Sequence, residues 1–131
     1  MSYNARAAYV DNSVSTANPA RLLVMLFDRL VLDIQRGLTS IEAGNKQETH
    51  DHLLHAQDIV MELRCSLKTE GWEGGPGLAS IYDWLHTQLI KANVGKNATI
   101  AGNCLQLVND LADTWREAAI ASVVEPPAAA S

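Results

Sequence analysis

Apolar residues recur at the helical period in four separate segments of this chain, and glycine or proline falls between the segments. A helix with one apolar stripe buries that stripe against other helices. No segment alternates apolar and polar residues with a period of two, so we expect no sheet. We therefore predict an all-α fold. The clearest stripe has an a/d heptad spacing and consists of Leu53, Ala56, Val60, Leu63 and Leu67.

Four helices are expected at residues 19–43, 46–69, 78–93 and 97–122. Asn18 is a suitable N-cap for the first helix, and Pro19 fits its first turn because no N–H is needed there. Gly95 follows the third helix in the manner of a C-cap. The sequence EGWEGGPG separates the second and third helices. Helices of similar length with short connections favour an antiparallel up-down four-helix bundle with a short N-terminal segment that caps it.

A chain of 131 residues has the size of one domain. We assign residues 1–123 to the bundle, with 1–17 as the capping segment, and 124–131 to a disordered tail. Asn93 is expected to end the third helix and Trp115 to lie in the core, both in structural roles. The other expected core residues are Leu23, Phe27, Leu30, Ile34, Leu38 and Ile41, then Leu78, Ile81, Tyr82, Leu85, Leu89 and Ala92, and finally Ile100, Cys104, Leu107, Leu111 and Ala118.

Charge and composition exclude several classes of protein. The formal net charge is −5 and no basic stripe is visible, so nucleic acid is not an expected partner. The N-terminus has neither the basic nor the apolar region of a signal peptide, and no apolar run approaches the ~20 residues that span a bilayer. We therefore expect a cytoplasmic protein without membrane insertion. Its two cysteines, Cys65 and Cys104, are expected to be reduced and buried.

The helices carry more apolar residues than one inward stripe requires. At about 100° per residue, some fall on another side of the first and second helices, and others form a flank of the fourth. A groove for a partner's helix or extended segment would explain them. An irregular bundle that buries them itself, or a weak homodimer, would also explain them. The candidate partner-binding residues are Leu22, Met25, Leu32, Leu54, Met61, Leu105 and Ala112, and we place Cys65, Ala101 and Ala119 on the same outward sides.

Two tyrosines, Tyr3 and Tyr9, stand in an otherwise polar N-terminal segment. We expect them to fold back onto the bundle and cover the groove while no partner is bound. The alternative is a frayed terminus without a role.

Residues for catalysis are missing from the sequence, and we predict neither an enzyme nor a bound cofactor or metal. Glu48, His52 and His55 share a helical face, but a solvated face is the preferred interpretation over zinc. No Glu-x-x-His pair, nucleophile–base pair or phosphate-binding loop is present.

Markers spread along the chain resemble the FliS family of flagellar secretion chaperones, over roughly residues 3–117. Phe27 stands where the family usually has tyrosine, and Trp84 where tyrosine or phenylalanine is common. The loop around Trp72 matches no family pattern. The markers are Tyr3 and Tyr9, Thr16–Pro19 with Leu22, Met25–Asp28, Ala56–Leu63, Leu78 with Ile81–Leu85, Leu89, Ala92–Asn93 and Trp115–Glu117.

The resemblance implies a function and a fold. Such chaperones bind the C-terminal segment of flagellin in the cytoplasm, prevent its premature polymerisation and assist its delivery to the type III export gate. The family fold is an antiparallel helical bundle, around which the bound segment wraps, and the N-terminal segment is thought to cover part of that surface beforehand. A self-associating helical adaptor with another protein partner remains the alternative function.

Overall fold

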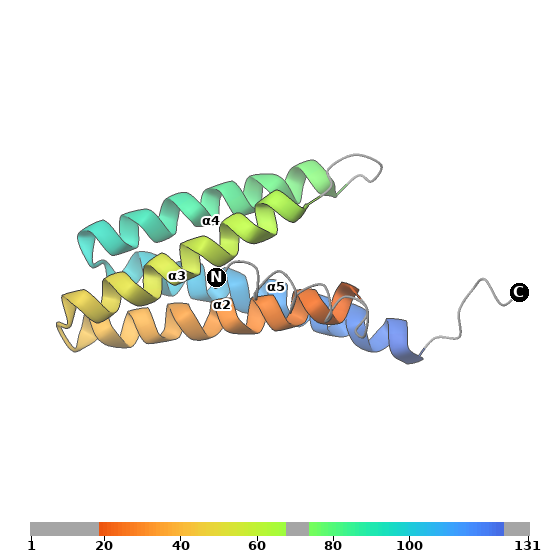
Figure 1. Cartoon of the computed structure of the whole chain (residues 1–131), viewed down its shortest axis with the longest axis horizontal. Coiled ribbons are helices and arrows are strands. Elements are labelled where there is room, and N and C mark those ends of the chain that lie inside the picture. The colour runs from red at the N-terminus through yellow and green to blue at the C-terminus, as the bar shows by residue number, and fades with distance from the viewer. Residues whose placement is uncertain (1–18, 68–73, 125–131) are drawn as a thin grey trace, which may run out of the picture.

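The computed structural model describes residues 19–67 and 74–124, and in these residues it contains four helices and no strand (Figure 1). The helices are α2 (Pro19–Glu42), α3 (Lys46–Ser66), α4 (Gly75–Gly95) and α5 (Ala98–Val124). Each of α2 and α4 packs against both α3 and α5, so α2 lies diagonally opposite α4. The prediction of an all-α four-helix bundle is confirmed.

The core is formed by the inward stripes of all four helices. Phe27 of α2 and Tyr82 of α4 meet across the diagonal, with ring centroids 6.4 Å apart. Burial of each large apolar side chain stabilises the bundle by roughly 1.5–3 kcal/mol. The fully buried large members are Phe27, Tyr82, Leu30, Ile34, Leu53, Leu63, Leu85, Leu89, Val60 and Val108.

Asparagine side chains begin two of the helices. Asn45 accepts a hydrogen bond from the Glu48 backbone N–H at 3.0 Å, and Asn97 accepts one from the Ile100 backbone N–H at the same distance. These bonds satisfy N–H groups that have no partner within the helix. The α2–α3 turn passes through Gly44, whose φ of +72° suits glycine.

Two helix ends differ from expectation. The left-handed residue that ends α4 is Lys96, with φ +48°, and not Gly95. Its side chain donates to Asn93 Oδ1 at 2.7 Å, which anchors the turn. At its other end, α4 begins at Gly75 and not near residue 78, because Pro76 is tolerated in a first helical turn.

Several expected burial positions are wrong. Cys65 is exposed, which agrees with its place opposite the heptad stripe and not with the expectation of a buried thiol; Ala118 is also exposed, and Val108, which was not assigned to the core, is fully buried. Ala101 and Ala112 lie in the core and not on an outward flank. Their small side chains are fully or almost fully buried. The side chain of Ala119 lies outside the described part of the chain.

The two helix pairs diverge toward the end of the bundle where α2 begins and α5 ends (Figure 1). No helix in the described ranges is long and apolar enough to cross a membrane.

Candidate functional site: the apolar surface around helix α4

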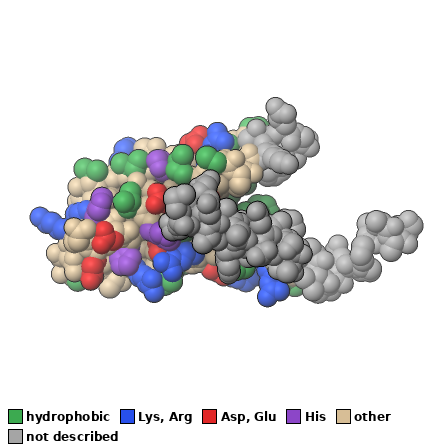
Figure 2. Space-filling view, in the orientation of Figure 1, with side chains coloured by type: hydrophobic (Ala, Val, Ile, Leu, Met, Phe, Trp, Pro, Cys, Tyr) green, Lys and Arg blue, Asp and Glu red, His purple; other side chains and the backbone are tan. Residues whose placement is uncertain are grey.

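Large apolar side chains are exposed on the outer surface shared by α3 and α4. We call Leu54, Met61, Ile90 and Val94 the α3–α4 face; their exposed fractions run from 39% to 81%. Leu54, Met61 and Ile90 lie between two polar contacts that mark the helix seam, the Arg64–Asp83 ion pair and the His50–Asn93 hydrogen bond. Figure 2 shows several hydrophobic side chains over α3 and α4.

A groove on the other side of α4 adds to this surface. Ser80, Ile81 and Trp84 of α4 and Leu107 of α5 line a hollow of about 310 Å³. Trp84 is 45% exposed. A half-exposed tryptophan over an apolar hollow is typical of protein-binding surfaces, because it offers a large rigid contact area. Together, the α3–α4 face and this α4–α5 groove form what we call the α4 surface.

A third apolar site lies at the divergent end of the bundle, and we call it the end cavity. It encloses about 280 Å³. Burial raises the pKa of Tyr82, which lines it, from 10 to about 12. Its other apolar lining residues are Leu23, Leu63, Leu67, Leu78 and Trp115.

The predicted groove residues do not form one site. Leu54 and Met61 belong to the α4 surface, whereas Met25 is exposed on α2. The prediction that Ala112 lies on an outward face is wrong, because it is 2% exposed in the core. The binding roles of the exposed candidates stay predictions. Leu22, Leu32 and Leu105 are partly buried, on helices other than α4.

The sequence reasoning missed the contribution of α4 to this surface. Trp84, Ile90 and Val94 are apolar residues outside the inward stripe of that helix. Placing the residues of α4 at about 100° steps, as for the other three helices, would have identified these three residues. Helix α4 was assigned only an inward stripe, so its surplus apolar positions remained unassigned.

Tyr3 and Tyr9, predicted to cover the groove, lie outside the described residues, and so does Asn18, the first of the four residues predicted as structural. Pro19 is the first residue of α2. Two others are placed directly: Asn93 is buried and hydrogen bonds to His50 Nδ1 at 3.0 Å, and Trp115 is partly buried against the core.

In contrast to the apolar α4 surface, the contact between α2 and α3, which we call the α2–α3 seam, contains charged and polar side chains. Asp33 is fully buried, and its carboxylate Oδ2 contacts His55 Nδ1. Arg29 Nε lies 3.3 Å from the other oxygen, which has no hydrogen-bond donor. His55 therefore serves as a hydrogen-bond partner of the buried Asp33 carboxylate, and in the described ranges no three His, Cys, Asp or Glu side chains are grouped to hold a metal ion.

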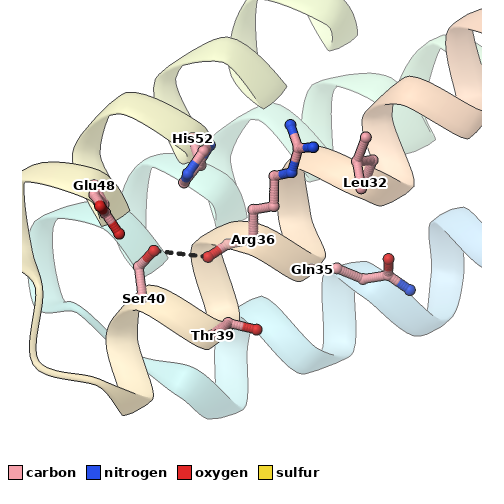
Figure 3. Close-up of a pocket in the computed structure, with 7 residues that line it drawn as sticks. All are labelled: Leu32, Gln35, Arg36, Thr39, Ser40, Glu48 and His52. Atoms are coloured by element: carbon pink, nitrogen blue, oxygen red, sulfur yellow. Dashed lines mark hydrogen bonds between the residues drawn. The ribbon is translucent and has the colours of Figure 1, made fainter.

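A polar groove also lies on this seam (Figure 3). Leu32, which was predicted to contact a partner, lines it together with Arg36, Glu48 and His52. Leu32 is thus separated from the α4 surface by charged side chains.

Comparison with known proteins gives the family. Residues 2–122 match the family model described as flagellar protein FliS. The flagellar secretion chaperone FliS of Bacillus subtilis (strain 168) is 29% identical over 115 residues, or 88% of this chain and 86% of the relative. Those of Vibrio cholerae and Salmonella typhimurium are 24% and 27% identical, over 81% and 82% of this chain and 79% and 82% of their own lengths.

A crystal structure of a bacterial flagellar chaperone shares the fold. It matches with a TM-score of 0.72 over 90% of this chain and 97% of the other, at 21% identity. The chain belongs to the FliS family, a family of flagellar secretion chaperones and not of enzymes.

Proposed function

We propose that this protein binds the C-terminal segment of flagellin in the cytoplasm, prevents its premature polymerisation and assists its delivery to the flagellar type III export apparatus. Family membership and the names of the relatives support this role. The observation that carries the proposal is the α4 surface, where exposed apolar side chains lie on both sides of one helix. A disordered segment that folds onto this surface hides residues through which it would otherwise polymerise.

The α4 surface suits a segment that wraps around the bundle. Its two parts, the α3–α4 face and the α4–α5 groove, lie on either side of one helix. A flat helix face would bind one short helix, whereas two neighbouring sites favour a longer chain that crosses α4. The aliphatic and methionine side chains adapt to varied partner shapes, and Trp84 provides a rigid anchor.

The test is calorimetric titration of the full chain with a peptide from the C-terminal end of the same organism's flagellin. We expect a one-to-one complex with a negative heat-capacity change, because apolar surface is buried. Met61→Glu should weaken binding about tenfold or more, since a carboxylate would have to be desolvated in the interface. Ile120→Glu is the control: Ile120 is 59% exposed and Met61 43%, but Ile120 lies on α5 and is not a candidate partner-binding residue.

The two variants separate a local role from general damage to the fold. Both should retain the helical circular dichroism signal of the wild-type chain. Equal loss of binding in the two variants would remove the α4 surface from the proposal. If Met61→Glu bound the peptide as tightly as the wild-type chain, Met61 would not be part of the binding site.

A cover for the free protein is the second element of the proposal. The chain enters α2 at Pro19, and Leu23, one turn later, lines the end cavity. This position of the first turn of α2 supports the proposal that the residues before it, with Tyr3 and Tyr9, act as the cover. Deleting residues 1–15 should raise the fluorescence of a dye that binds exposed apolar surface. An unchanged signal would argue against the cover.

A self-associating adaptor is the alternative function, and the same apolar surface could serve it. It would show a dimer that forms with increasing protein concentration and no heat with the flagellin peptide. The export gate is the expected second partner under the main proposal, with release of flagellin by competition there.

A further inference from the structure

The polar groove on the α2–α3 seam has no place in the flagellin-binding proposal. It encloses about 370 Å³. The groove lies between α2 and α3, and α2 is diagonally opposite α4 in the bundle. The groove is therefore away from the α4 surface. A ligand in this groove and a segment on the α4 surface could be bound at the same time.

A missing side chain on α2 allows close packing against α3 beneath the groove. Gly37 of α2 faces α3, and a Cβ at this glycine would lie 2.6 Å from Leu53 Cδ2 and 3.8 Å from His52 Cβ. The helix backbones therefore approach closely beneath the groove. The longer side chains on either side, those of Arg36 and His52, rise along its walls (Figure 3).

Arg36 has an available charge. The other arginines of the described ranges have partners: Arg29, Arg64 and Arg116 contact carboxylates, and Arg21 also has an interaction. The Arg36 side chain is exposed and makes no ion pair or hydrogen bond within this part of the chain. In Figure 3 its guanidinium extends toward the space between His52 and Leu32, whereas Glu48 lies at the other end, near Ser40.

We propose that this groove binds the carboxylate of an acidic peptide segment from a second protein partner. The guanidinium of Arg36 holds the carboxylate, and the imidazole of His52 donates a further hydrogen bond to it. The aliphatic residue next to the acidic one rests on the partly buried side chain of Leu32. A planar guanidinium suits a carboxylate because it can donate two parallel hydrogen bonds.

The two ends of the groove make the site selective for a peptide over a free anion. Glu48 repels a second negative charge and accepts hydrogen bonds from backbone N–H groups. A polyanion such as a nucleic-acid backbone would place charge along the whole groove and meet Glu48. An acidic residue beside an aliphatic one complements the charges and the apolar wall together.

The test uses two synthetic peptides, acetyl-Leu-Glu-Leu-amide and its glutamine counterpart, titrated into the isotope-labelled full chain. We expect saturable NMR shifts of the Leu32, Arg36 and His52 amides with the acidic peptide, and at least tenfold weaker binding of the glutamine peptide. Arg36→Gln should weaken acidic-peptide binding by a similar factor. Lys91→Gln, which removes an exposed cation from α4, should leave it unchanged.

Several results would overturn the site. They are the absence of saturable shifts, equal binding of both peptides, and shifts that persist in Arg36→Gln. Loss of binding in Lys91→Gln would show that only the overall charge matters. With the flagellin peptide already bound, the acidic peptide should bind with unchanged affinity; competition would refute a separate site.

Discussion

The close approach of α2 and α3 at Gly37 gives a quantitative prediction for the variant Gly37→Ala. The added Cβ would lie 2.6 Å from Leu53 Cδ2 and 2.9 Å from Leu53 Cγ. Carbon atoms pack at about 3.5–4.0 Å, so Leu53 or the helices must move by roughly 1 Å. Leu53 is fully buried among the side chains of the core. Overpacking of this kind costs about 1–3 kcal/mol.

A gain in helix propensity partly offsets this cost, and a second glycine measures the gain separately. Replacing glycine by alanine inside a helix stabilises it by up to about 1 kcal/mol. A Cβ at Gly102 in α5 would meet no neighbouring side chain or helix within 4 Å, so Gly102→Ala should show only the gain. The difference in unfolding free energy between the two variants then isolates the steric cost at Gly37.

Urea unfolding followed by far-UV circular dichroism measures this difference. We expect Gly37→Ala to be less stable than Gly102→Ala by about 1–3 kcal/mol. In the Gly37→Ala background, Leu53→Ala should cost less than in the wild-type chain, because it relieves the clash. If Gly37→Ala were as stabilising as Gly102→Ala, the reasoning on the α2–α3 approach would be refuted.

Three further predictions concern buried polar groups. His55→Ala should lower stability by about 1–3 kcal/mol, because it leaves Asp33 buried with only Arg29 nearby, and adding Asp33→Asn should recover part of the loss in a double-mutant cycle. In the folded protein, a maleimide should label exposed Cys65 quickly at neutral pH and Cys104 only after unfolding, as read by mass spectrometry; burial raises the pKa of the Cys104 thiol to about 11. Unfolding free energy should fall by a few kcal/mol between about pH 8 and pH 12, because unfolded Cys104 and Tyr82 release protons that the folded state retains; an unchanged urea midpoint over that range would contradict this.

Helix positions could be predicted from the sequence because their causes are local. The stripe of α3 depends only on residues within one or two turns, and the fourth helix, expected to begin at residue 97, is capped there by the Asn97 side chain. The end of α4 depends on more than its glycine. Lys96 adopts the left-handed conformation because its side chain reaches Asn93, a contact that a glycine rule does not include.

The outward surface could be predicted only in part because it depends on the arrangement of the helices. A helical wheel gives the angle around α5 between Ala112 and the core residue Cys104. It does not give how wide an arc of the circumference of α5 the neighbouring helices cover. Helix α5 packs closely against α2, so this arc includes Ala112. Met61 was placed correctly because it lies far outside any arc that two neighbours could cover. Residues near the edge of the buried arc require the three-dimensional structure.

The proposed cover also has a consequence for affinity. Val94 is 81% exposed and Trp84 45%, so the α4 surface leaves substantial apolar area open to solvent. If the N-terminal segment competes with flagellin and contributes about 2 kcal/mol when closed, about one molecule in 30 is open and the apparent affinity is about 30-fold weaker. Deleting residues 1–15 should then tighten flagellin-peptide binding by this factor in calorimetry, while Met61→Glu still weakens it. If the deletion raised dye binding but left the affinity unchanged, the segment would cover a surface that flagellin does not use, and the end cavity would be separate from the binding site.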